Sequence, residues 1–195
     1  MAKAPVAGYA KTRLIPALGA DGAAQVAQRL LRHAIAQAVA ADIGPVELCC
    51  APDARHAEFV ELAGDARVTL SEQGDGDLGA RMARALQRAL AANECALLIG
   101  TDAPGLDARY LREAFNRLAN HDAVLVPAFD GGYALIGLRR FEPTLFEAMP
   151  WSTSQVLAIT RERLQAAGIH HAELAPLHDI DEPADLVHLH GAAWT

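Results

Sequence analysis

The chain has 195 residues, of which 52% are hydrophobic and only 5% aromatic, and its formal net charge is -7. This length suits a single domain (1–195), and the acidic balance argues against a nucleic-acid partner, which would favour a basic face. No apolar run reaches the ~20 residues of a membrane span, and no signal peptide is visible. The three cysteines include no C-x-x-C pair and indicate neither disulfides nor a zinc site. We therefore expect a cytoplasmic protein without a membrane partner.

Strand-like and helix-like segments alternate through most of the chain. The expected strands are Val46–Ala51, Val68–Leu70, Ala96–Gly100, Ala123–Pro127, Tyr133–Leu138 and Glu173–Leu177. The expected helices are Gly22–Ala41, Asp53–Ala63, Leu78–Ala92, Leu106–Leu118, Thr153–Ala167 and Pro183–His190. This alternation predicts an α/β fold, in which a mainly parallel sheet lies between two layers of helices and ligands bind at the carboxyl ends of the strands.

The start of the chain departs from this pattern. Residues 1–20 contain no apolar run long enough for the strand that normally opens such a sheet. Either the first strand is missing, or the sequence begins later than the natural protein does.

A basic loop occupies Lys3–Leu14, with the sequence K-A-P-V-A-G-Y-A-K-T-R-L. Lys3, Lys11 and Arg13 bring three positive charges to a segment marked as a loop by proline and glycine, and a helix follows. Such a loop can neutralise a polyphosphate, although the glycine spacing is not that of a Walker motif. The alternative is a solvated arm whose basic residues are incidental.

A glycine-rich segment, Gln73–Met82, reads Q-G-D-G-D-L-G-A-R-M. Its glycines would let the backbone approach a ligand at the start of a helix, and Gln73 could hydrogen-bond a nucleobase edge. The alternative is an ordinary loop that connects a strand to a helix, with Asp77 as the N-cap.

Aspartates follow several predicted strands. Asp102 lies in I-G-T-D-A-P-G-L, and Asp130 precedes a glycine pair in F-D-G-G-Y. Asp179 and Asp181 are two residues apart, so that an extended segment would point both the same way. Carboxylates of this kind hold Mg²⁺ and bridge it to phosphate, and one of these two could complete a site opened by Asp102. The alternatives are an Asx-turn at Asp102 and a plain hairpin turn at Asp130.

These segments together resemble a known family. K-A-P-V-A-G-Y-A-K-T-R-L, G-D-L-G-A-R-M, G-T-D-A-P-G-L, D-G-G-Y-A-L-I-G-L, P-W-S-T and D-I-D-E-P-A-D-L occur in this order in the radical-SAM/selenodomain-associated transferase 1 family. That family is similar to the phospholactate guanylyltransferases and has the nucleotide-diphospho-sugar transferase fold, also called GT-A-like. The resemblance spans the chain from Lys3 to Leu186 and is more specific for family than for reaction.

The resemblance implies roles for individual residues. Lys3, Lys11 and Arg13 match the region that holds the phosphates, whereas Gln73 and Gly79 match the base pocket. It assigns the metal, Mg²⁺ or Mn²⁺, to two residues of this chain, Asp102 and Asp181.

Two departures from the family pattern are visible. The family's apolar first strand, which would be central in the sheet, is absent, and its loss would expose the edges of two neighbouring strands. Where D-D-G-G-Y is common, this chain has Phe129 in place of the first aspartate.

The leading hypothesis is a metal-dependent nucleotidyltransferase that joins a nucleoside triphosphate to a phosphorylated small molecule, with Lys11 and Arg13 stabilising charge. The first alternative is a glycosyltransferase that uses a nucleotide-sugar, with Asp130 or a neighbour as the base and Gly131 and Gly132 beside the substrate. The second alternative is a non-catalytic nucleotide-binding protein. The acceptor and homodimer formation are left open.

Overall fold

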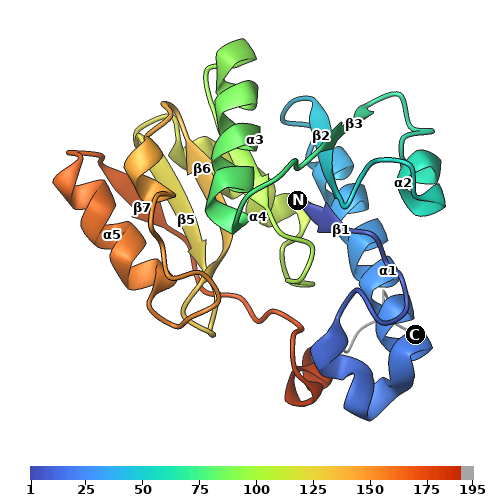
Figure 1. Cartoon of the computed structure of the whole chain (residues 1–195). Coiled ribbons are helices and arrows are strands. Elements are labelled where there is room, and N and C mark those ends of the chain that lie inside the picture. Colours follow the sequence, from blue (N-terminus) through green and yellow to red (C-terminus); the bar gives the residue numbers. More distant parts are fainter. Residues whose placement is uncertain (190–195) are drawn as a thin grey trace.

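The computed structural model describes residues 1–189, which form two neighbouring sheets with helices around them (Figure 1). The strands are β1 (Ala2–Lys3), β2 (Val46–Ala51), β3 (Val68–Glu72), β4 (Ala96–Ile99), β5 (Ala123–Pro127), β6 (Tyr133–Leu138) and β7 (His171–Glu173). The α-helices are α1 (Ile15–Ala41), α2 (Ala57–Leu62), α3 (Leu78–Ala92), α4 (Ala108–Arg117) and α5 (Val156–Ala166). Three 3₁₀ helices are η1 (Thr12–Leu14), η2 (Pro143–Leu145) and η3 (Pro183–His188).

The first sheet is parallel, with the strand order β1-β2-β3, and the second has the order β4-β6-β5-β7. In the second sheet β6 is antiparallel to β4 and β5, whereas β7 is parallel to β5. The molecule is therefore a mixed α/β fold that contains a parallel sheet, as the alternation of elements predicted.

The expectation that the first strand is missing needs a correction, because two residues form one. Ala2 and Lys3 pair in parallel with Cys50 and Ala51 of β2. The Met1 ammonium donates a hydrogen bond of 3.0 Å to the carbonyl of Ile99, at the end of β4. The short strand β1 therefore lies between β2 and β4, and backbone pairing forms it without the apolar run that marks a longer strand.

Several further boundaries differ from the prediction. Helix α2 begins at Ala57 instead of Asp53, and α5 begins at Val156 instead of Thr153. Helix α1 begins at Ile15 instead of Gly22, and it contains one non-helical residue, Gly19, with φ 71°. A strand was expected at 173–177, but β7 spans His171–Glu173, since these are the residues that pair with β5. Further on, Leu177 forms an isolated bridge with Ala128. The bounds of β2, α3, β5 and β6 are those predicted.

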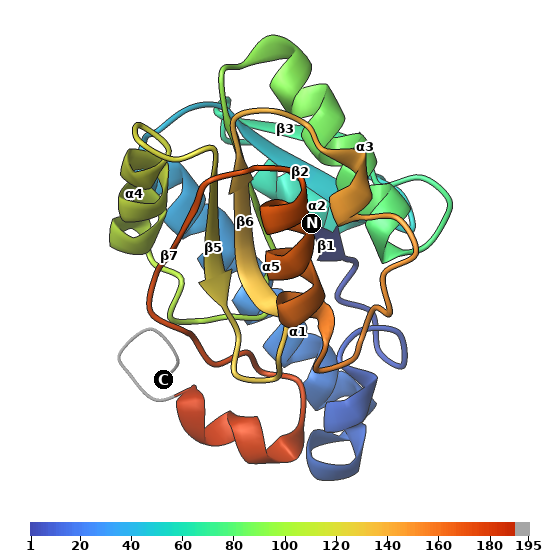
Figure 2. The same ribbon diagram turned by 90° about the vertical axis from the view of Figure 1, so that its left-hand side faces the viewer.

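The four-stranded sheet is covered on both faces, which the rotated view in Figure 2 helps to follow. Leu125 and Ile136 point to a core shared with α3 and α5, and the alternate residues Val124, Val126 and Leu135 point to a core shared with α4 and the end of α1. This alternation confirms a three-layer arrangement. None of the described helices combines the length and the apolar character needed to cross a bilayer.

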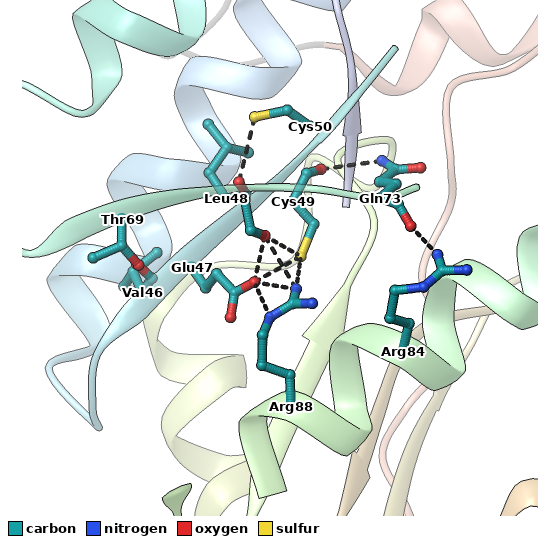
Figure 3. A network of polar contacts seen from close by, with 10 residues as sticks. Val46, Glu47, Leu48, Cys49, Cys50, Thr69, Gln73, Arg84 and Arg88 are labelled. Atoms are coloured by element: carbon teal, nitrogen blue, oxygen red, sulfur yellow. Dashed lines mark hydrogen bonds and ion pairs between the residues drawn. The ribbon is translucent and has the colours of Figure 1, made fainter. Parts of the chain in front are cut away.

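Polar contacts attach α3 to the three-stranded sheet (Figure 3). Arg88 pairs with Glu47, donating from Nε at 2.9 Å, and its Nη2 donates to Ser71 Oγ at 3.1 Å and to Cys49 Sγ at 3.4 Å. All three cysteines are free. Burial raises the pKa of Cys50 to about 12, so this thiol is neutral at physiological pH.

Candidate functional site

The basic loop and two of the predicted aspartates meet beyond the end of β4. Lys11 Nζ lies 2.7 Å from Asp102 Oδ1 and 3.5 Å from Asp181 Oδ1. Arg13 Nη1 lies 2.6 Å from Asp181 Oδ2. The backbone closes the arrangement, because the Ile180 amide donates a 2.9 Å hydrogen bond to the Asp102 carbonyl. Two cations and two carboxylates from three distant segments therefore form one cluster.

Lys11 is the most enclosed member of this cluster. Its side chain is 7% exposed, compared with 50% for Asp102, 41% for Asp181 and 58% for Arg13. Although Nζ is within ion-pairing distance of both carboxylates, no acceptor among residues 1–189 is aligned to take a hydrogen bond from it. The charge of this buried ammonium is therefore compensated by the two carboxylates, while its three donors are not all used.

A small apolar core explains why these segments meet. Leu14, at the end of the basic loop, and Ile180, beside Asp181, are both fully buried and pack together with Leu30 of α1. The carboxylate of Asp185 accepts hydrogen bonds from the Asp181 and Glu182 amides at 3.0 and 2.7 Å, which fixes the backbone at Asp181. Asp185 lies in the first turn of η3.

Helix α1 also holds the loop that carries Asp102. His33 Nε2 lies 3.0 Å from the Pro104 carbonyl, and Gln37 Oε1 accepts a 2.9 Å hydrogen bond from the Ala108 amide. Sequence reasoning did not identify His33 and Gln37, because helical periodicity gives no sign of which loop a helix face will contact.

The position between the two carboxylates is taken by a side-chain cation. Oδ1 of Asp102 and Oδ1 of Asp181 both face one positive centre, which here is the Lys11 ammonium. Among residues 1–189 there is no group of three or more His, Cys, Asp or Glu side chains that could hold a metal. Two carboxylates suit Mg²⁺, which commonly completes its coordination with phosphate oxygens and water, and do not suit a structural zinc site.

Asp130 and the glycine pair form the turn between β5 and β6. Asp130 Oδ1 accepts a 2.8 Å hydrogen bond from the Gly132 amide, as in an Asx-turn. Gly131 has φ 91°, and a Cβ atom there would lie 2.3 Å from the Ser154 carbonyl oxygen. Burial raises the pKa of Asp179, and the negative charge of Asp130 raises it further.

The Gln73 side chain makes its hydrogen bonds within the three-stranded sheet and does not face an open pocket. Its side chain is buried, and Nε2 donates to the carbonyls of Ala2 at 2.9 Å and Cys49 at 3.0 Å. Only Oε1 would be left for a nucleobase edge. Lys3 lies exposed at the end of β1, and within the described part of the chain no hydrogen bond or ion pair joins it or Gln73 to the Lys11 cluster.

Replacing Gln73 with leucine is expected to destabilise the protein by about 1–3 kcal/mol, because two buried carbonyls lose their donor. Urea unfolding would measure the change. An unchanged unfolding free energy, together with weaker nucleotide binding, would contradict the structural role and favour the base contact.

Gly79 is a close-packing position in the first turn of α3. A Cβ atom there would lie 2.4 Å from the Phe146 carbonyl oxygen and 2.7 Å from Trp151 Nε1. The G-D-L-G-A-R-M and P-W-S-T segments therefore contact each other. Asp77 caps this helix by accepting a 2.8 Å hydrogen bond from the Ala80 amide, as the alternative interpretation of the segment predicted.

The variant Gly79→Ala is expected to lose about 1–3 kcal/mol of stability, because backbone or indole must move to admit the methyl group. Gly22→Ala in α1 is the matched control, since its added Cβ atom would meet only the Cβ atom of Leu18, at 3.0 Å, and neither backbone nor indole. Thermal unfolding of the two variants would compare them, and equal melting temperatures would refute the packing role of Gly79.

Solved structures share this fold. A protein from Desulfovibrio desulfuricans G20, provisionally named a nucleotide-diphospho-sugar transferase, is 29% identical, with a TM-score of 0.89 over 98% of this chain and 89% of that chain. A CMP:2-keto-3-deoxy-manno-octonic acid synthetase in complex with CTP is 13% identical, with a TM-score of 0.56 over 82% of this chain and 85% of the other. The search of curated proteins found no match.

The fold is thus that of the nucleotide-diphospho-sugar transferases and of the CMP-sugar synthetases. The chain belongs to the DUF2064 family, described as uncharacterized proteins conserved in bacteria, whose match covers residues 34–153.

Proposed function

We propose that this protein is a transferase for a nucleotide-activated substrate, and specifically a metal-dependent nucleotidyltransferase. The observation that carries the proposal is the convergence of Lys11 and Arg13 with Asp102 and Asp181. Cations for a polyphosphate and carboxylates for a divalent metal are the two elements that phosphoryl chemistry requires, because catalysis depends on positioning and charge neutralisation.

In the proposed reaction, a phosphate oxygen of the acceptor attacks the α-phosphorus of a nucleoside triphosphate. The bond between the α-phosphorus and the bridging oxygen breaks, and pyrophosphate leaves. Lys11 and Arg13 would neutralise the charge that develops on the triphosphate, while Asp102 and Asp181 would hold Mg²⁺ or Mn²⁺. The metal, when bound, supplies Lewis-acid stabilisation of the phosphate oxygens.

The named functions of the similar structures support this class of activity. One neighbour was solved with CTP, and the other is named for nucleotide-diphospho-sugars. The similarity of the sequence motifs to the radical-SAM/selenodomain-associated transferase 1 family and the phospholactate guanylyltransferases favours nucleotidyl transfer to a phosphorylated small molecule in a cytoplasmic setting.

The second candidate is a glycosyltransferase, which the name of the Desulfovibrio protein favours. Asp130 would act as the base there, with Oδ2 available because Oδ1 is engaged by the Gly132 amide at 2.8 Å. The third candidate, a non-catalytic nucleotide-binding protein, would use the same cations without turnover.

Pyrophosphate release separates these candidates. The four common nucleoside triphosphates would be tested with Mg²⁺ or Mn²⁺ and a panel of phosphorylated small molecules. Nucleotidyl transfer predicts pyrophosphate release with one triphosphate and only with metal. Release of nucleoside diphosphate from a nucleotide-sugar would instead identify the glycosyltransferase, and binding without either product would identify the non-catalytic protein.

A further inference from the structure

Three stacked rings lie beside the acidic side of the candidate site. The rings of Phe129 and His178 are 4.2 Å apart between centroids with an interplanar angle of 23°, and those of His178 and His188 are 3.7 Å apart at 12°. The rings come from the β5–β6 turn, the segment after β7, and η3. We call this group the ring stack; neither the proposed phosphate contacts nor the metal contacts use it.

Phe129 forms one end of the stack and is held firmly. Its amide donates a 3.2 Å hydrogen bond to the Leu177 carbonyl, and the preceding residue, Ala128, forms a parallel bridge with Leu177. The Ala128 amide donates to the Gly132 carbonyl at 3.0 Å, which closes the turn. The ring is therefore presented by a fixed backbone rather than by a free loop.

Despite this support, the side chain is open to solvent. Phe129 is 61% exposed, more than any other large hydrophobic residue among positions 1–189. Exposed phenylalanine forgoes hydrophobic stabilisation that burial would supply. A rigid aromatic side chain at the carboxyl edge of the sheet provides a surface on which another planar ring can stack with favourable geometry.

The charges around Phe129 restrict what can stack there. Asp130 follows Phe129 in the chain and Asp179 follows His178, whereas the cations Lys11 and Arg13 pair with Asp181, three residues after His178. An anionic ring would be repelled by these carboxylates, and the triphosphate of the donor is attracted to the cations. The two ends of the site therefore favour different parts of the two substrates.

We propose that Phe129 is a specificity residue that stacks against an uncharged planar ring on the acceptor. This inference rests on the proposed nucleotidyl transfer and names the acceptor class more closely, as a phosphorylated molecule that carries an aromatic or similarly flat group. The phosphate of such a molecule would extend toward Lys11 and Arg13, and its ring would extend the ring stack.

The test compares phenyl phosphate with cyclohexyl phosphate, which have the same charge but differ in planarity. Dissociation constants would be measured calorimetrically with the full chain in the presence of Mg²⁺. The wild type is expected to bind phenyl phosphate about three- to tenfold more tightly than cyclohexyl phosphate. Phe129→Leu should remove this preference, Phe129→Tyr should retain it, and Phe115→Leu, on exposed α4, should leave it unchanged.

Each outcome bears on the inference. A preference that survives in Phe129→Leu, or binding of neither phosphate, overturns it. If Phe129→Leu instead weakens the binding of a nucleoside triphosphate but not that of inorganic triphosphate, the Phe129 ring contacts the base of the donor and the acceptor assignment is wrong. If the ring preference depends on Phe129 while the wild type releases no pyrophosphate from any triphosphate, the ring subsite stands and the proposed nucleotidyl transfer fails.

Discussion

Replacing Lys11 with methionine is expected to weaken binding of a nucleoside triphosphate by about tenfold to a hundredfold, the value of a hydrogen bond from a charged group. Affinity for the corresponding free nucleoside should change little, because the ammonium would contact phosphate only. Calorimetric titration of both ligands with Mg²⁺ present would measure the two effects. Equal losses for nucleoside and triphosphate would show that the substitution acts through folding and not through charge.

The same variant offers a test that needs no nucleotide. In the wild type the Lys11 ammonium already faces the carboxylates of Asp102 and Asp181 at 2.7 and 3.5 Å. In Lys11→Met only Arg13 remains, on Asp181 Oδ2, and Asp102 has no cationic partner, so Mg²⁺ should raise the melting temperature of the variant more than that of the wild type. Lys11→Arg is the control that retains the charge, and an equal response of all three proteins would argue against a shared cation position.

The sequence predicted the large apolar elements well, since their signals are local. Continuous apolar runs and helical periodicity identified β5 and α3 with the observed bounds. Strand β1 was not predicted, because two residues of backbone pairing leave no pattern in the side chains. The start of α1 was placed too late, since Gly19 interrupts the helix with φ 71° and local propensity could not show that it continues on both sides.

Which of the candidate residues lie together was predicted in part, and the difference again depends on which signals are local. Aspartates after strands and a basic loop correctly indicated Lys11, Asp102 and Asp181 as neighbours, because strand ends share an edge of the sheet. Gln73 and Gly79 have the residue types of a ligand-binding loop, but their environments are set by long-range contacts with the sheet and with Trp151. No sequence pattern distinguishes a glycine that lies beside a bound ligand from one that packs against an indole ring of the protein itself.

The proximity of Asp102 and Asp181 also leads to a prediction about metal binding. Its expected effect on activity is larger than that of the Lys11 substitution. Asp102→Asn and Asp181→Asn should each abolish the rise in melting temperature that a nucleoside triphosphate produces only with Mg²⁺ or Mn²⁺. Each change removes one of the two proposed anionic metal ligands while preserving side-chain volume. Pyrophosphate release, if present in the wild type, should fall by at least about a hundredfold, since the metal neutralises charge that forms in the transition state.

Asp107→Asn is the matched control, because it lies in the same loop as Asp102 and changes the net charge equally. Its carboxylate caps α4 by accepting a 2.8 Å hydrogen bond from the Tyr110 amide, and asparagine is an equally good N-cap. The metal-dependent shift should therefore persist in Asp107→Asn. If all three variants lose the shift alike, the cause is the net charge of this edge of the protein; if Asp102→Asn and Asp181→Asn keep it, the metal binds elsewhere and the two carboxylates serve only as partners of Lys11 and Arg13.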